Sequence, residues 1–387
     1  MIKIKKLKKI VIITSRYPTD TDPAYTFVDK LVCEMADQGI DCTVISPSSI
    51  SANILRKREV VPKYRERITK KGNIIKIYHP KYVSFSNKSF MGINTGIITL
   101  RNFEKSAERI INKLDSEFNA IYAHFIMPSG MTANKIGRKK SIPSFLAYGE
   151  CSIDQFDFIG LDKVRSGLHD IRGVISVSTS NKDILIKHKI IEDKKIEVFP
   201  NAIDSEVFYK RDKSEMRRKF GFKDNEFIVA FVGYFIERKG PLRVLEALEN
   251  EDVKFIFIGS GPQIPKGNNI LFCDKLEPNK IPELLSAADV FVLPTLAEGC
   301  CNAIIEAMSC GLPIVSSDLP FNKDILNNEN SIMINPLDVN EIKKAVLSIK
   351  NNKELMERMS KESLKISQEL SIENRAKKII SFMESKI

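Results

Sequence analysis

The sequence predicts an α/β fold made of two domains, each with a mainly parallel sheet. Three observations lead to this prediction. The 387 residues are enough for two separate hydrophobic cores. Short apolar runs alternate with amphipathic helical segments through both halves of the chain. No internal repeat or low-complexity linker interrupts this alternation, and we place the domains at residues 1–200 and 201–370.

The first elements predict a βαβ unit. KKIVIITSRYP is an apolar strand, residues 25–39 have apolar positions at helical spacing with Gly39 at the end, and CTVISP is a second strand. A right-handed βαβ unit makes the sheet parallel, so ligands are expected at the carboxyl ends of its strands. The loop between Arg16 and Thr26 is not a GxGxxG loop, which argues against a dinucleotide cofactor.

The rest of the first half continues in the same way. IIKIYHP is a strand, residues 97–114 a helix, and IYAHF a strand that ends near His124. SFLAYGE and GVISVS are further strands, with Ser178 or Ser180 as the cap of the helix that follows. A structural and a functional reading of His124 both stay open. The other three histidines are interpreted as structural: His79, His169 and His188.

The second half repeats the alternation. FIVAF is a strand followed by a loop and a helix that begins at Pro241, and VKFIFIGSGPQ is a strand with glycines 259 and 261 after it. ADVFVLPT is a buried strand ended by Pro294. The helix after it is expected to be capped by Asn302 and stopped by Gly311. A strand, SIMINP, and helices over 340–350 and 353–368 complete the domain.

The loop and helix after ADVFVLPT carry two carboxylates, Glu298 and Glu306. The helix N-terminus between them attracts an anion, most naturally a phosphate. Carboxylates beside a phosphate are repulsive unless they bind something else, and the hydroxyl groups of a sugar are suitable donors. Arg238 and Lys239, just before another helix, are placed to meet a diphosphate. The alternatives are an ordinary surface helix and an exposed basic pair.

ADVFVLPTLAEGCCNAIIEAMSCGLPIV resembles the EX7E region of glycosyltransferase family 4, a retaining family with the GT-B fold. FVGYFIERKG, PNAID and YAHFIMPSG match further family segments in the same order. The resemblance implies two Rossmann-like domains that face each other across a cleft. It also implies that the closing helix, residues 371–387, crosses back to the first domain. The first domain would bind the acceptor and the second the nucleotide sugar, with a linker at Pro200 and Asn201.

The resemblance also implies roles for individual residues. The catalytic residues would be His124, Glu298 and Lys239. The remaining contacts are assigned to the donor diphosphate (Arg238, Lys239, Cys301 and Asn302), the donor sugar (His124, Glu298, Gly299, Cys300 and Cys301), the ribose (Glu306) and the nucleobase (Lys275 and Leu276). No metal or cofactor is expected. Four positions depart from the family pattern. Relatives often have a glycine near Thr26 and at Ala202, many have an arginine at Tyr234, and Glu150 stands in a segment where relatives often show HGxD.

Composition indicates where in the cell the protein works and which surfaces it could bind. No apolar run approaches the roughly 20 residues that cross a bilayer, so we expect a cytoplasmic protein. The seven cysteines contain no CxxC pair and are interpreted as reduced thiols. Residues 1–200 have 34 basic and 21 acidic residues, against 26 and 28 in residues 201–387. The densest basic segment, residues 56–81, is either a solvated loop or a patch for an anionic membrane.

The sequence therefore predicts a retaining hexosyltransferase that moves a sugar from a UDP- or GDP-sugar to a saccharide or lipid-linked acceptor in bacterial surface glycoconjugate synthesis. A nucleotide-sugar 2-epimerase with the same fold and a non-enzymatic sugar-binding protein are the alternatives. Only four histidines are present, which disfavours the epimerase. The basic segment has few aromatic residues, so no nucleic-acid partner is expected.

Overall fold

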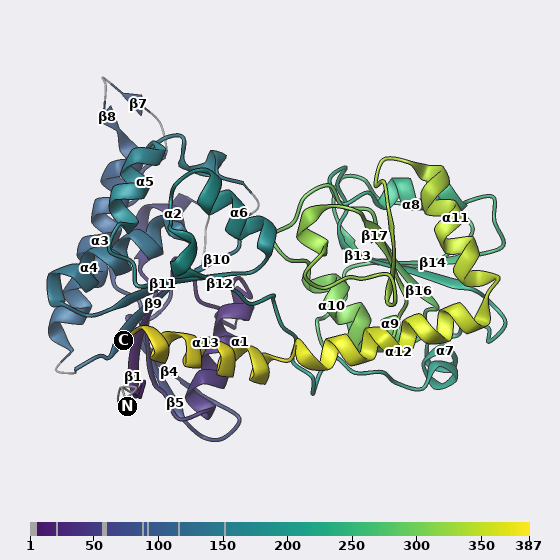
Figure 1. Cartoon of the computed structure of the whole chain (residues 1–387), viewed down its shortest axis with the longest axis horizontal. Coiled ribbons are helices and arrows are strands. Elements are labelled where there is room, and N and C mark those ends of the chain that lie inside the picture. Colours follow the sequence, from purple (N-terminus) through teal and green to yellow (C-terminus); the bar gives the residue numbers. More distant parts are fainter. Residues whose placement is uncertain are drawn as a thin grey trace. The chain divides into compact units, whose positions relative to one another are not determined.

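The computed structural model describes residues 6–20, 22–55, 60–86, 89–90, 93–114, 117–150 and 152–387. Residues 56–59 of the basic segment and Cys151 lie outside this set. The chain divides into two compact units. Unit 1 contains residues 1–199 and 375–387, and unit 2 contains residues 200–374. Figure 1 labels the elements of both units.

Unit 1 is built on an eight-stranded sheet that is parallel except for its edge strand β4. In sheet order the strands are β12 (Ile196–Val198), β11 (Gly173–Ser176), β10 (Ser144–Tyr148), β9 (Ala120–His124), β1 (Lys9–Ile13), β2 (Asp41–Ile45), β5 (Ile74–Tyr78) and β4 (Tyr64–Ile68). Chain order turns back between β9 and β1, so this is the topological switch point of the sheet. Ligand sites of doubly wound sheets form at such points.

Most helices of unit 1 pack on the sheet through their apolar faces, whereas α2 (Ile50–Leu55) has no buried residue. The helices are α1 (Thr26–Asp37), α2 (Ile50–Leu55), α3 (Thr95–Lys113), α4 (Met131–Lys140), α5 (Leu161–Leu168) and α6 (Thr179–Lys187). Short two-residue pairings join β3 (Ser48–Ser49) to β6 (Lys81–Tyr82) and β7 (Ser89–Phe90) to β8 (Ile93–Asn94). A single core contains Phe103 of α3, Ile136 of α4, Val164 of α5 and Ile121 of β9.

The C-terminal helix α13 (Ile372–Lys386) brings the end of the chain back to unit 1, as Figure 1 shows in yellow. The Phe382 ring lies 6.3 Å from the Phe145 ring and 6.1 Å from the Phe199 ring, centroid to centroid. The Leu7 amide donates to the Glu384 carboxylate over 2.9 Å. The returning closing helix expected from the resemblance is thus present.

Unit 2 has a six-stranded, fully parallel sheet. In sheet order the strands are β15 (Ile270–Asp274), β14 (Lys254–Ser260), β13 (Ile228–Tyr234), β16 (Val290–Leu293), β17 (Ile314–Ser317) and β18 (Ser331–Ile334). The helices are α7 (Lys213–Phe220), α8 (Pro241–Leu248), α9 (Ile281–Ser286), α10 (Asn302–Ser309), α11 (Val339–Lys350) and α12 (Lys353–Glu369). This strand order is that of a Rossmann fold, with its switch point between β13 and β16.

The described part of the basic segment, residues 60–81, is an antiparallel hairpin of β4 and β5 rather than a solvated loop. Two of its arginines bind inside the unit. Arg65 donates to the Pro18 carbonyl and to Nε2 of His79, and Arg67 lies 3.6 Å from the Asp29 carboxylate. The sequence could not show this, because the partners are distant in the chain.

Two glycines after β14 let the neighbouring loop come close. A methyl group at Gly259 would lie 1.9 Å from the carbonyl oxygen of Gly233, and one at Gly261 would lie 2.4 Å from that of Phe235. Both residues also have φ of +155°, which disfavours any side chain. The GxG pattern therefore serves the packing of the loop after β13, which carries Arg238 and Lys239.

We predict that Gly259→Ala lowers the free energy of unfolding by about 3 kcal/mol, because backbone must move to admit the methyl group. Chemical denaturation of the purified protein measures this loss. Gly267→Ala is the matched control, since its methyl group would meet only a Leu245 carbon at 3.9 Å. Equal stability of the two variants would contradict the packing role of Gly259.

Candidate active site

The candidate site of unit 2 lies at its switch point, where the loops after β13 and β16 meet. The Leu296 amide donates to the Arg238 carbonyl over 2.8 Å, which joins the two loops through the backbone. The buried guanidinium of Arg243 on α8 donates to the carbonyls of Glu237 and Pro294, each over 2.9 Å. Arg243 therefore holds both loops, a role that no local sequence signal could indicate.

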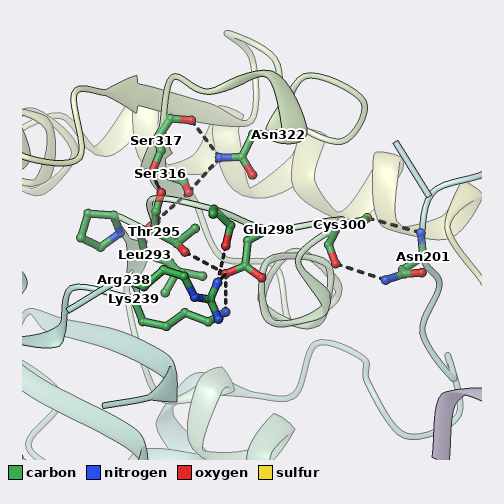
Figure 2. Close-up of polar contacts among 12 residues, drawn as sticks. Asn201, Arg238, Lys239, Leu293, Thr295, Glu298, Cys300, Ser316, Ser317 and Asn322 are labelled. Atoms are coloured by element: carbon green, nitrogen blue, oxygen red, sulfur yellow. Dashed lines mark hydrogen bonds and ion pairs between the residues drawn. The ribbon is translucent and has the colours of Figure 1, made fainter. Parts of the chain in front are cut away.

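Glu298 is the centre of a charged cluster at this point (Figure 2). Its Oε1 atom lies 2.5 Å from Nζ of Lys239 and 3.1 Å from a guanidinium nitrogen of Arg238, and it accepts a hydrogen bond from the Thr295 hydroxyl over 2.8 Å. The structure thus brings together three residues that the sequence placed in two separate loops. Thr295 is an addition that the sequence analysis missed.

The cluster carries a net positive charge, because two cations share one carboxylate. The side chains of Lys239 and Glu298 are only 13% and 11% exposed, so their attraction is poorly screened by water. The Arg238 side chain is 40% exposed and also donates to the Ala297 carbonyl. A negatively charged ligand is therefore attracted to this point, and Arg238 is the cation most accessible to it.

A buried polar network supports the loop that carries Glu298 (Figure 2). The Ser316 hydroxyl donates to the Leu293 carbonyl over 2.7 Å, and the Ser317 hydroxyl donates to the Thr295 carbonyl over 2.6 Å. The Asn322 amide donates to both serines. These bonds tie the end of β16 to the end of β17, which limits the positions that Glu298 can take.

Helix α10 begins directly after this loop, and the expectation that Asn302 caps it is wrong. The helix starts at Asn302, and the cap position is Cys301, which makes no side-chain capping bond. The Asn302 side chain instead accepts from the Asn201 amide over 2.9 Å. The same amide donates to the Cys300 carbonyl over 3.1 Å, as Figure 2 shows. Asn201, expected as part of the linker, thus holds the start of α10 from a distant part of the chain.

The adjacent cysteines of this loop are buried. Burial raises the pKa of the Cys301 thiol to about 12, although the nearby Lys239 ammonium acts in the opposite direction. The thiol is therefore protonated at neutral pH, which suits a small packing residue and not a nucleophile. Among the residues that the structure describes, no group of three or more His, Cys, Asp or Glu side chains could hold a metal ion.

The remaining predicted donor contacts belong to the same unit as this cluster. Glu306 lies on α10 about one turn after Asn302 and is partly exposed. Lys275 and Leu276 follow β15 at the edge of the sheet, and the Lys275 amide donates to the Asp274 carboxylate over 2.6 Å. Gly299 stands between Glu298 and the cysteine pair.

His124 belongs to unit 1, where it ends β9 at the switch point of the sheet. Its ring is 5% exposed and lies among the aromatic rings of Phe27, Tyr122 and Phe125, at centroid distances of 5.2 to 5.9 Å. Burial and the Arg375 guanidinium lower the pKa of His124 to about 3. Its Nδ1 atom has no hydrogen-bond partner within the described residues. The imidazole is therefore neutral.

Glu150, a departure from the family pattern, supports the segment after His124. Its carboxylate accepts from the Ile126 amide over 2.8 Å and from the Gly149 amide over 3.2 Å. Burial raises the pKa of Glu150 to about 7, while these backbone bonds limit the rise. The acidic residue thus fixes backbone next to His124.

We predict that His124 makes the fold less stable in acid. Below pH 6.5 the unfolded chain protonates this histidine, whereas the folded chain keeps it neutral until about pH 3, so the free energy of unfolding falls as pH falls. Between pH 6.5 and 5 the loss from this group is about 1–2 kcal/mol.

Denaturation curves of the wild type and of His124→Phe at several pH values measure this effect. Glu150 acts in the opposite direction over the same range, because its raised pKa means that the folded state binds its proton more tightly. Both proteins retain Glu150, so the difference between their pH profiles reports His124. Parallel profiles would show that the histidine is not held neutral.

Comparison with known proteins shows which proteins this chain resembles. Residues 212–365 match the family described as Glycosyl transferases group 1. The TuaC protein of Bacillus subtilis, named as a teichuronic acid biosynthesis glycosyltransferase, is 25% identical over 360 residues, which cover 87% of this chain and 88% of TuaC. The UDP-Gal:alpha-D-GlcNAc-diphosphoundecaprenol alpha-1,3-galactosyltransferase of Escherichia coli is 31% identical over 204 residues, covering 47% of this chain and 52% of that enzyme.

Solved structures show the same fold over nearly the whole chain. Sucrose-phosphate synthase from Thermosynechococcus elongatus superposes with a TM-score of 0.74 at 16% identity, covering 98% of both chains. Anabaena HepE, solved in complex with UDP, superposes with a TM-score of 0.73 at 15% identity, covering 97% of this chain and all of HepE. These neighbours confirm the expected GT-B fold.

Proposed function

We propose that this chain, a glycosyltransferase with a glycosyl transferases group 1 domain at residues 212–365, is a retaining hexosyltransferase that uses a UDP- or GDP-sugar. The observation that carries the proposal is the cluster of Arg238, Lys239 and Glu298 at the switch point of unit 2. A positive cluster beside a helix N-terminus suits a diphosphate, and a carboxylate within it suits sugar hydroxyls.

Each group of the cluster has a task in this proposal. As the bond between sugar and phosphate breaks, negative charge grows on the leaving diphosphate, and Arg238, Lys239 and the start of α10 stabilise it. The proposal assigns this task to protein groups, with no divalent metal required. Glu298, with the backbone of residues 299–302, orients the sugar. The poorly exposed ion pair with Lys239 holds the Glu298 carboxylate in place.

The other assignments rest more on the resemblance than on contacts in the structure. Glu306 would accept hydrogen bonds from the ribose, and the backbone at Lys275 and Leu276 would meet the nucleobase. Because the Lys275 amide already donates to Asp274, the base would use the Lys275 carbonyl or the Leu276 backbone. The neutral imidazole of His124 would donate or accept a hydrogen bond toward the donor sugar.

The relatives support the choice of donor and acceptor. The Escherichia coli relative is named for a UDP-galactose donor and a diphosphoundecaprenol-linked acceptor, and HepE was solved with UDP and with UDP-glucose. We therefore propose a saccharide or lipid-linked acceptor in bacterial surface glycoconjugate synthesis. No described helix has the length and apolar content to span a membrane. Peripheral binding at the inner face of the plasma membrane is part of the proposal.

Donor turnover tests the function. The purified wild type is expected to hydrolyse slowly one of a panel of UDP- and GDP-sugars, and NMR should show the released sugar first in the anomeric form of the donor, as retention requires. Lys239→Ala should lower kcat/KM for that donor at least about 100-fold, because the leaving diphosphate loses a cation.

Lys343→Ala is the matched control, since Lys343 forms a comparable ion pair with Glu251 at 2.5 Å outside the site. Denaturation of both variants checks that they fold. No turnover or binding of any nucleotide sugar by the wild type would refute the proposed function, and near-normal turnover by a folded Lys239→Ala variant would refute the role of the cluster.

Glu306 is tested with nucleotides that differ only in the ribose. Glu306→Ala should weaken binding of the preferred diphosphate, UDP or GDP, by about ten-fold or more, because hydrogen bonds to a charged group are lost. Binding of the 2′,3′-dideoxy form should barely change. Calorimetric titration measures both, with the exposed Glu246→Ala on α8 as control. Equal weakening of both nucleotides would mean that Glu306 does not contact the ribose.

A further inference from the structure

Unit 1 contains a pocket of about 650 Å³ whose lining has no part in the donor site described above. It lies at the carboxyl ends of β1, β2 and β5, and its lining includes Arg16, Asp22, Ser48, Ser49, Asn53 and His79. The carboxyl edge of a parallel sheet is where doubly wound folds bind ligands. The volume falls within the range of small-molecule sites.

The lining is rich in groups that exchange hydrogen bonds, yet its net charge is zero. Arg16 and Asp22 form an ion pair at 2.6 Å, and both side chains remain more than one-third exposed. The hydroxyl of Ser48 accepts from the Asn53 amide over 3.0 Å, and the hydroxyls of Ser49 and Ser84 lie 2.5 Å apart. Hydroxyls, an amide, a carboxylate and a guanidinium are the groups that pair with the alcohols of a saccharide.

His79 at the base of the pocket is held neutral by its neighbours. Its Nδ1 atom lies 2.9 Å from the Ser46 carbonyl, and its Nε2 atom accepts from Arg65, so the proton is on Nδ1. Burial lowers the pKa of His79 to about 4. The pocket therefore presents no unbalanced titratable charge to an occupant, which fits a neutral saccharide.

The segments that line the pocket also expose large apolar side chains. Ser48 to Asn53 contribute to the lining, while Ile54 and Leu55 of the same stretch are 73% and 83% exposed. Val61 lines the pocket while Val60 is 74% exposed, and Ser84 lines it between the exposed residues Val83 and Phe85. We call these exposed residues (Ile54, Leu55, Val60, Val83 and Phe85) the apolar rim.

Direct contacts hold the segments of the rim together. The backbone of Ser48 pairs with that of Lys81, the Ser51 hydroxyl donates to the Ser84 carbonyl over 2.6 Å, and the Lys81 ammonium donates to the Val61 carbonyl over 2.7 Å. A polar pocket thus continues into exposed apolar residues. Residues 1–200 also hold the basic excess of the chain, so an anionic lipid surface is complementary in charge.

We infer that this pocket binds the saccharide of a lipid-linked acceptor while the apolar rim contacts its lipid chain at a bilayer surface. The inference rests on the proposed function, because it names the acceptor class of that transferase. It explains why the three most exposed large apolar side chains among the described residues of unit 1, Leu55, Val60 and Ile54, stand beside a pocket of hydrogen-bonding groups. An amphiphilic acceptor matches both surfaces, whereas a free saccharide matches only the pocket.

The test compares methyl and octyl glycosides of glucose, galactose and N-acetylglucosamine, used below the micelle concentration of the octyl forms. Calorimetric titration of the full-length protein should show that at least one octyl glycoside binds about ten-fold or more tightly than its methyl form. Ile54→Ser/Leu55→Ser should remove this preference and leave methyl glycoside binding unchanged. Asp22→Asn should weaken both forms.

Matched controls come from the same chain. Ile264→Ser/Leu337→Ser removes two exposed apolar side chains from unit 2, and Asp162→Asn breaks an exposed ion pair with Arg165. Neither should change glycoside binding. No binding of any octyl glycoside, equal affinity for both forms, or an octyl preference that survives the rim variant would each overturn the inference.

A second measurement uses sedimentation with vesicles. The wild type should sediment with phosphatidylglycerol vesicles, whereas the rim variant, Ile54→Ser/Leu55→Ser, should stay in the supernatant. A smaller fraction of the wild type should sediment with phosphatidylcholine vesicles. Retention of the rim variant at the wild-type level would count against the rim. UDP and GDP titrations of the same samples separate the two proposals. Normal nucleotide binding without an octyl preference defeats only this inference, while absent nucleotide binding defeats the proposed function.

Discussion

The pairing of Glu298 with Lys239 and Arg238 is the contact on which the candidate site of unit 2 depends. It brings one carboxylate and two cations within 3.1 Å at the switch point of a parallel sheet. The Lys239 ammonium and the Glu298 carboxylate are both poorly exposed, and each would be destabilising without the other, since burying an unpaired charge is costly. Together they leave one positive charge beside a helix N-terminus, which is the electrostatic setting that a diphosphate needs.

The surrounding structure serves to hold this cluster in position. Arg243 joins the loops after β13 and β16, the serines of β17 bind the carbonyls that precede Glu298, and Asn201 holds the start of α10. The glycines after β14 let the Arg238 loop approach closely. A site built in this way is preorganised, so little reorganisation is required when charge develops on a leaving group.

In unit 1, burial favours the neutral forms of two titratable side chains. His124 ends β9 and Glu150 follows the neighbouring strand β10, and burial opposes the charge of both. The Glu150 carboxylate accepts hydrogen bonds from two backbone amides, which partly compensate its burial, whereas the His124 imidazole is surrounded by aromatic rings. Toward the other side of the sheet, the ends of β1, β2 and β5 form a polar pocket with exposed apolar neighbours. The two regions therefore differ in chemistry, one buried and aromatic and the other polar with exposed apolar neighbours.

The sequence by itself determined the α/β class, most of the parallel strands and several of the helices between them, the strand-end position of His124, and the presence of charged residues in the two loops of unit 2. These properties depend on local periodicity and on residues near each other in the chain. Only the tertiary structure decided that Glu298 pairs with both cations, that Asn302 bonds Asn201 instead of capping α10, and that the basic segment forms a hairpin bound through Arg65 and Arg67. Each of these depends on partners distant in the chain, which local sequence patterns do not reveal. The same reason hid Arg243 and the pocket of unit 1, because their surroundings exist only after the strands are placed side by side.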